Sequence, residues 1–231
     1  MESVLGRSTL WDEYLVVIDG VSPLEGGQPK NPELIRAWLE SKGEPEEIIA
    51  KQVAEMGLTA EEAAALVASA KEAGSWCGFK SDGERYYLGC FQVKAMLKEC
   101  ASVLKLTQRK RGLRDLNQHG NHVRPVDPGA GDRLYVTTPD DQWVTGELPT
   151  RDSVCHLWRG SALKRNDYID PWRLAFVVRL LCVDRARGGW DPRQLTEADL
   201  KTVLQLAEES GLGANRSQGY GRFRVVEFKE L

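Results

Sequence analysis

A cluster of glycines and arginines near the C-terminus is the part of this sequence best suited to contact a polyanion. Residues 211–228 read GLGANRSQGYGRFRVVEF, which places Arg216 and Arg222 among four glycines. Glycine lets one backbone approach another closely, and arginine can bind two phosphate oxygens at once. These residue types predict contact with a nucleic acid or a neighbouring subunit. The alternative is a plain turn that returns the chain into its last strand.

The position of this segment excludes a nucleotide-binding P-loop. Residues 196–209 before it have the cap and apolar spacing of a helix, and residues 222–228 after it alternate like a strand. A P-loop has the opposite order, because its phosphates bind at the N-terminus of the helix that follows. The segment also lacks a Gly-Lys-Ser/Thr motif.

A pair of histidines provides the only plausible acid–base chemistry in the sequence. His119 and His122 lie three residues apart in the basic stretch 105–124, close to Arg124. A histidine next to cationic side chains is a suitable general base for metal-independent RNA cleavage. The alternative is that both side chains pack or bind RNA passively, and we assign no catalytic residue. His156 falls in a predicted strand, where a structural role is expected.

Composition narrows the protein class. The 231 residues are 42% hydrophobic, enough for a folded core, and contain no membrane-length apolar run or basic, apolar N-terminal signal. We therefore expect a cytoplasmic location and no membrane partner. The five cysteines are widely spaced and have no Cys-x-x-Cys pair, so neither a metal site nor a cofactor is expected.

The net charge of −3 conceals an uneven distribution. Residues 1–70 carry 5 Lys/Arg and 13 Asp/Glu, whereas residues 105–124 alone carry six basic residues and one acid. An acidic segment is thus joined to a basic one, and the basic one suits a nucleic-acid partner.

The order of the predicted elements indicates an α+β fold. Strands are expected at 13–19, about 133–158, 172–183 and 222–228, and helices at 91–104 and 197–209. This βαββαβ order is that of ferredoxin-like, or RRM-like, domains. The core is expected to comprise residues 1–24 and 76–231. Residues 25–75 are predicted to be an acidic helical insertion, because helix starts recur at Asn31, Pro45 and Thr59.

Several segments of the chain resemble the RAMP superfamily, the RRM-like proteins of CRISPR systems. GLGANRSQGYGRFRV resembles the glycine-rich loop that precedes the last strand in that superfamily. LVVIDGVSPL (15–24), LGCFQVKAMLKECASVL (88–104) and the region 146–181 resemble its first strand, its first helix and a part of small, sometimes phage-encoded, Cas7-like proteins. The likeness covers most of the chain outside 25–75 and is closest to the Cas7-like members.

The resemblance implies a non-catalytic RNA-binding backbone subunit that polymerises along a guide RNA. Its implied partners are the guide RNA, copies of itself and other CRISPR effector subunits. A thumb-like hairpin is expected within 137–170. The implied RNA contacts are Lys105, Arg109, Lys110, Arg111, Arg114, Arg124, Arg159, Lys164, Arg165, Gly213, Arg216, Ser217, Gly219, Tyr220 and Arg222.

Two alternatives to this reading remain open. One is a Cas6-like metal-independent endoribonuclease that uses His119 or His122. The other is a phage single-strand nucleic-acid-binding or assembly protein of the same fold. Bases could stack on Trp143, Trp158 and Tyr168. A tryptophan in a strand, however, more often lies in the core.

Overall fold

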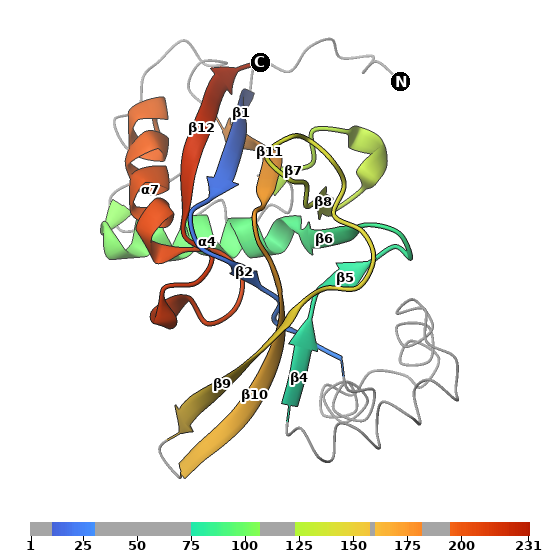
Figure 1. Ribbon diagram of the computed structural model, residues 1–231. Coiled ribbons are helices and arrows are strands. Elements are labelled where there is room, and N and C mark those ends of the chain that lie inside the picture. The colour runs from blue at the N-terminus through green and yellow to red at the C-terminus, as the bar shows by residue number, and fades with distance from the viewer. Residues whose placement is uncertain (1–10, 31–74, 107–122, 158–159, 182–194) are drawn as a thin grey trace, which may run out of the picture.

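The computed structural model describes residues 11–30, 75–106, 123–157, 160–181 and 195–231. These residues form a mixed α+β fold in which two long helices accompany three β-sheets (Figure 1). The α+β class predicted from the sequence is thereby confirmed.

The main sheet contains the first and last described strands side by side. Its members are β1 (Trp11–Gly20), β7 (Val123–Arg124), β11 (Arg173–Leu181) and β12 (Phe223–Glu230). Their spatial order is β12-β1-β11-β7, and each neighbouring pair is antiparallel. Alternate residues of β1, such as Val16 and Ile18, are buried, as are Leu174 and Phe176 of β11. This period of two was predicted for residues 172–183, whereas residues 13–19 were predicted as a short apolar strand without alternation.

The two helices pack their apolar faces into the same core as the main sheet. They are α4 (Cys90–Val103) and α7 (Glu197–Ser210). The Thr196 hydroxyl accepts a hydrogen bond from the Asp199 N–H at the start of α7, and the Asp199 carboxylate accepts one from the Thr196 N–H. Gly211, at φ 75°, ends this helix. Figure 1 shows α4 crossing behind the strands and α7 beside β12.

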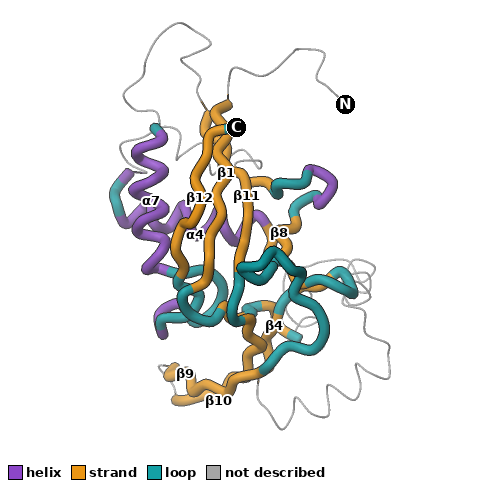
Figure 2. Tube along the Cα trace, turned by 45° about the horizontal axis from the view of Figure 1, so that its top comes forward, coloured by secondary structure: helices purple, strands orange, loops and turns teal. Residues whose placement is uncertain are grey.

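A second sheet carries a long β-hairpin. It contains β2 (Leu24–Glu25), β3 (Gln28–Pro29), β4 (Ser75–Gly78), β9 (Thr150–Leu157) and β10 (Gly160–Ile169). Its order is β2-β10-β4-β3, and β9 pairs with β10. The β9–β10 hairpin extends away from the main sheet and the helices in both views (Figures 1 and 2). It lies inside the range 137–170 in which a thumb-like hairpin is expected.

A third, smaller sheet has the order β5-β6-β8 and lies next to the N-terminal end of α4. Its strands are β5 (Lys80–Ser81), β6 (Tyr86–Gly89) and β8 (Arg133–Tyr135). The turn between β5 and β6 contains the Asp-Gly pair at 82–83, with Gly83 at φ 98°. An Asp-Gly pair is typical of such a tight turn between two antiparallel strands.

The prediction of one core strand over about 133–158 is wrong. Residues 133–135 pair with β6 in the third sheet, and residues 150–157 pair with β10 in the second. The two-residue strand β7 takes the position beside β11 instead. Of the predicted helical insertion 25–75, the described residues 25–30 and 75 contain parts of the strands β2, β3 and β4 and no helix, and 31–74 lie outside the described residues.

Candidate nucleic-acid interface

The glycine-rich loop, residues 211–222, folds against the connection between β1 and β2. The Leu212 N–H donates to the Gly221 carbonyl at 2.9 Å, which closes the loop on itself. The Gly221 N–H donates to the Pro23 carbonyl at 2.8 Å, and the Ala214 N–H donates to the Glu25 carbonyl at 2.9 Å. The loop is therefore a fixed part of the fold, whose shape is set by backbone contacts with residues 23–25.

Close contact with neighbouring backbone explains two of the glycines in this loop, and a third glycine faces open space. A Cβ at Gly221 would lie 1.8 Å from the Leu212 carbonyl oxygen, and one at Gly213 would lie 2.7 Å from the Glu25 carbonyl oxygen. Gly219 also has a positive φ, 87°, but nothing lies within 4 Å of the Cβ position. Close approach thus accounts for Gly213 and Gly221, whereas Gly219 has a positive φ and faces open space where a side chain would lie.

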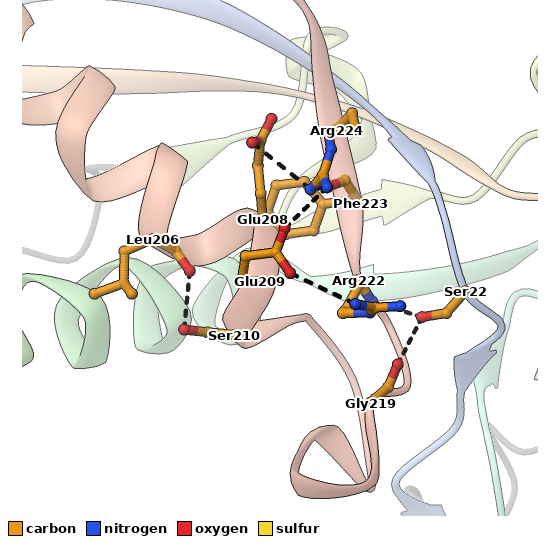
Figure 3. A network of polar contacts seen from close by, with 9 residues as sticks. All are labelled: Ser22, Leu206, Glu208, Glu209, Ser210, Gly219, Arg222, Phe223 and Arg224. Atoms are coloured by element: carbon orange, nitrogen blue, oxygen red, sulfur yellow. Dashed lines mark hydrogen bonds and ion pairs between the residues drawn. The ribbon is translucent and has the colours of Figure 1, made fainter.

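A polar network fixes the end of the loop where it enters β12 (Figure 3). The Ser22 hydroxyl donates to the Gly219 carbonyl and accepts from the Arg222 N–H, both at 2.9 Å. The Arg222 guanidinium reaches Glu209 at 3.5 Å, and Arg224 pairs with the same carboxylate at 2.9 Å. The predicted contact Arg222 is therefore held at the surface beside the C-terminal end of α7.

Four of the predicted arginine contacts form ion pairs within the chain. Arg216 pairs with Glu99 of α4 at 2.8 Å, and Arg165 makes two hydrogen bonds to Asp152 across the hairpin. Arg124 pairs with Glu13, and Arg222 with Glu209 as described above. Exposed ion pairs add little net stability because water and salt screen them. Such carboxylates orient a guanidinium and can be exchanged for phosphate oxygens.

A buried polar cluster connects the loop to the hairpin. The Glu25 carboxylate oxygen Oε2 accepts hydrogen bonds from the Asn166 amide at 2.7 Å and the Asn215 amide at 2.6 Å. Glu25 is 1% exposed and Asn166 is fully buried. Because Glu25 lies on β2, Asn166 on β10 and Asn215 in the loop, a single carboxylate ties three segments together.

Beside this cluster, Arg151 of β9 lies close to two tyrosine rings. Its guanidinium is 5.0 Å from the Tyr168 ring centre and 5.2 Å from the Tyr220 ring centre. A hydrogen bond with Tyr220 is the main cause that raises the pKa of Arg151 above its ordinary value. Tyr220 belongs to the predicted contacts, and Tyr168 to the possible stacking residues. Arg151 was not predicted, since an arginine among scattered charges carries no signal of its own.

The remaining predicted contacts are placed as follows. Lys105 is exposed at φ 57° just after α4, Ser217 is exposed, and Gly213 and Lys164 are half-buried. Outside the described residues lie Arg109, Lys110, Arg111, Arg114, Arg159, His119, His122 and Trp158. In the structure the glycine-rich loop contacts the hairpin through Tyr220 and Arg151. Arg124 lies apart from both, on β7 in the main sheet.

A second group of aromatic and arginine side chains covers the third sheet. The Arg85 guanidinium lies 4.0 Å from the Tyr135 ring centre and 5.2 Å from that of Trp143, which is 51% exposed. Backbone hydrogen bonding from Arg85 is the main cause that holds the pKa of Asp82 below its usual range. The Tyr135 hydroxyl also donates to this carboxylate. Trp143 is thus a surface residue, against the expectation that strand tryptophans are core.

The charge around this second group is acidic. Residues 80–89 and 133–147, which form it, include Asp82, Glu84, Asp140, Asp141 and Glu147. Only three lysines and arginines occur in these ranges, namely Lys80, Arg85 and Arg133. A phosphate chain is therefore less favoured here than beside the glycine-rich loop.

Within the described ranges, no three His, Cys, Asp or Glu side chains are grouped so that they could hold a metal ion. Burial raises the pKa of the Cys90 thiol to about 11, which keeps it protonated and unreactive. Neither described helix is long and apolar enough to cross a membrane.

In comparisons with known proteins, the chain matches no family model and no curated protein.

Proposed function

We propose that the core is ferredoxin-like, as RRM-like domains are. The support is the spatial order β12-β1-β11-β7 in a fully antiparallel sheet, with α4 after the first of these strands and α7 after the third in chain order. This is the arrangement expected of a βαββαβ domain. The second and third sheets are then elaborations inserted into its connections.

We infer that the protein binds single-stranded RNA on the surface formed by the glycine-rich loop and the base of the β9–β10 hairpin. The observation that carries this inference is the junction of these two segments at Arg151 and Tyr220. It joins a strand pair bearing Lys164 and Arg165 to a loop bearing Arg216 and Arg222. Basic side chains mixed with aromatic rings suit a single strand, since phosphates and bases are both exposed.

The intramolecular ion pairs are compatible with this function. Glu99, Asp152 and Glu209 form partly exposed ion pairs with three of these guanidiniums. A phosphate can replace each carboxylate, because an exposed pair is weak and phosphate offers the same bidentate geometry. The released carboxylates are then solvated at small cost.

We further propose that the protein acts as a repeated subunit along its RNA, as the resemblance to Cas7-like proteins implies. The protruding hairpin supports this role, because a strand pair that extends beyond the core can reach a neighbouring copy or the strand between two copies. Copies of the chain and other effector subunits are the protein partners that this proposal entails.

The salt dependence of RNA affinity tests the binding proposal. Each phosphate contact on a single strand contributes about −0.7 to the slope of log K against log salt concentration. Arg216→Gln and Arg222→Gln should therefore each reduce the steepness by about 0.7. Fluorescence anisotropy with a labelled unstructured RNA measures the slope. Arg85→Gln, on the acidic third sheet, is the matched control and should keep the wild-type slope. Undetectable binding, or slopes that no loop variant changes, would contradict the proposal.

A further inference from the structure

The arrangement of Arg151, Tyr168 and Tyr220 follows from the strand register. Arg151 pairs with Asn166 in the hairpin, and Tyr168 lies two residues beyond Asn166 on the same face of β10. Residues placed diagonally in this way are within reach of each other when one has a long side chain. The loop then adds Tyr220, so that the guanidinium lies within about 5 Å of two ring centres, 5.0 Å from Tyr168 and 5.2 Å from Tyr220.

The neighbours of these three side chains are held by buried contacts. Asn166 is the register partner of Arg151 and Glu25 that of Tyr168, both are buried, and Glu25 holds Asn215 of the loop. The Ala214 N–H and the Glu25 carbonyl add a backbone hydrogen bond at 2.9 Å. The rings and the guanidinium are thus held in place by buried contacts, while Arg151, Tyr168 and Tyr220 themselves remain partly exposed.

From this geometry we propose that Arg151, Tyr168 and Tyr220 form a stacking platform for one base of a single-stranded nucleic acid. The inference rests on the proposed RNA-binding function and names the part of the site that contacts a base. Planar rings and guanidinium groups stack on any base, so the platform binds without sequence preference. The phosphate of the same nucleotide is then close to Gly219, which adjoins Tyr220 and has open space above it.

The charge of the neighbouring residues favours nucleotide binding at this group over binding at the aromatic group of the third sheet. Arg216 and Arg222 lie within four residues of Tyr220, and Lys164 and Arg165 within four of Tyr168. Tyr87, by contrast, belongs to the acidic third-sheet segments. A nucleotide needs both a stacking plane and a nearby cation for its phosphate, and among the described groups the Arg151 group offers both without the excess of acidic residues that surrounds Arg85 and Tyr135.

Two oligomers separate stacking from phosphate binding in the test. One is an oligouridylate of about twelve nucleotides, and the other is an abasic strand with the same number of phosphates. Tyr220→Leu should weaken binding of the oligouridylate about 10-fold, within the range found when a stacking aromatic is removed. It should leave binding of the abasic strand unchanged. Tyr220→Phe keeps the ring and should therefore bind the oligouridylate more tightly than Tyr220→Leu does.

Tyr87→Leu is the matched control on the third sheet, and its affinity for both strands should equal that of the wild-type protein. If Tyr220→Leu weakens both strands equally, or neither, the stacking platform is wrong even though the protein binds RNA. If the wild-type protein binds neither strand, the proposed function itself fails. Thermal unfolding of each variant shows whether a loss of affinity reflects a loss of folding.

Discussion

Gly221→Ala is expected to lower the free energy of unfolding by about 3–5 kcal/mol, because two penalties act together. Gly221 has φ 69°, where a Cβ alone costs about 1–2 kcal/mol. The new methyl group would also lie 1.8 Å from the Leu212 carbonyl oxygen, which is backbone and cannot rotate away. A chain of this size should lose about 10 °C in Tm, measurable by circular dichroism.

Gly219→Ala is the control for this prediction. Gly219 has a similar φ of 87° in the same loop, but nothing lies within 4 Å of its Cβ position. Its substitution should therefore cost only the backbone strain, about 1–2 kcal/mol. Equal losses for the two variants would show that the close approach of Gly221 to Leu212 has no energetic weight.

Glu25→Ala is expected to destabilise the protein by about 2–5 kcal/mol and to weaken RNA binding as well. Truncation leaves the buried Asn166 amide and the Asn215 amide without their shared acceptor. Each such loss costs about 1–3 kcal/mol when the group stays buried. Because Asn215 is in the glycine-rich loop, its release also loosens Tyr220 relative to the hairpin. Chemical denaturation and RNA affinity measure the two effects on one sample.

Glu25→Gln provides the matched comparison. It keeps the size of the side chain and a carbonyl oxygen that can still accept a hydrogen bond, so its loss should be clearly smaller than that of Glu25→Ala. If alanine and glutamine behave alike, the hydrogen bonds to Asn166 and Asn215 do not hold the loop.

The main-sheet elements were predictable because each satisfies a local rule. β1 and β11 are rich in apolar residues typical of strands, and α7 has both a Thr196 cap and a Gly211 stop. The strand β7 was not predictable, since two residues, Val123 and Arg124, carry no periodic signal. β10 was not found from periodicity either, because GSALKRNDYI mixes charged and apolar residues on a strand that has neighbours on both edges.

The residues of the candidate site divide in the same way. Some can be recognised from the local sequence, and others only from contacts in the tertiary structure. The glycine-rich loop and its arginines are visible in the sequence as a run of unusual residue types. Their partners are not, because Glu99 is 117 positions from Arg216 and Glu25 is 190 positions from Asn215. Tertiary contacts at such separations depend on the whole fold. Arg151 becomes a candidate only when Tyr168 and Tyr220 are placed around it.

The central claim is that RNA lies on the joined surface of the glycine-rich loop and the β9–β10 hairpin. Photocrosslinking with RNA that contains 4-thiouridine, followed by peptide mass spectrometry, tests it most directly. We expect crosslinked peptides from residues 151–168 and 211–222, with Tyr220 among the modified positions. Crosslinks absent from both segments, or confined to the acidic third sheet at 80–89 and 133–147, would contradict it.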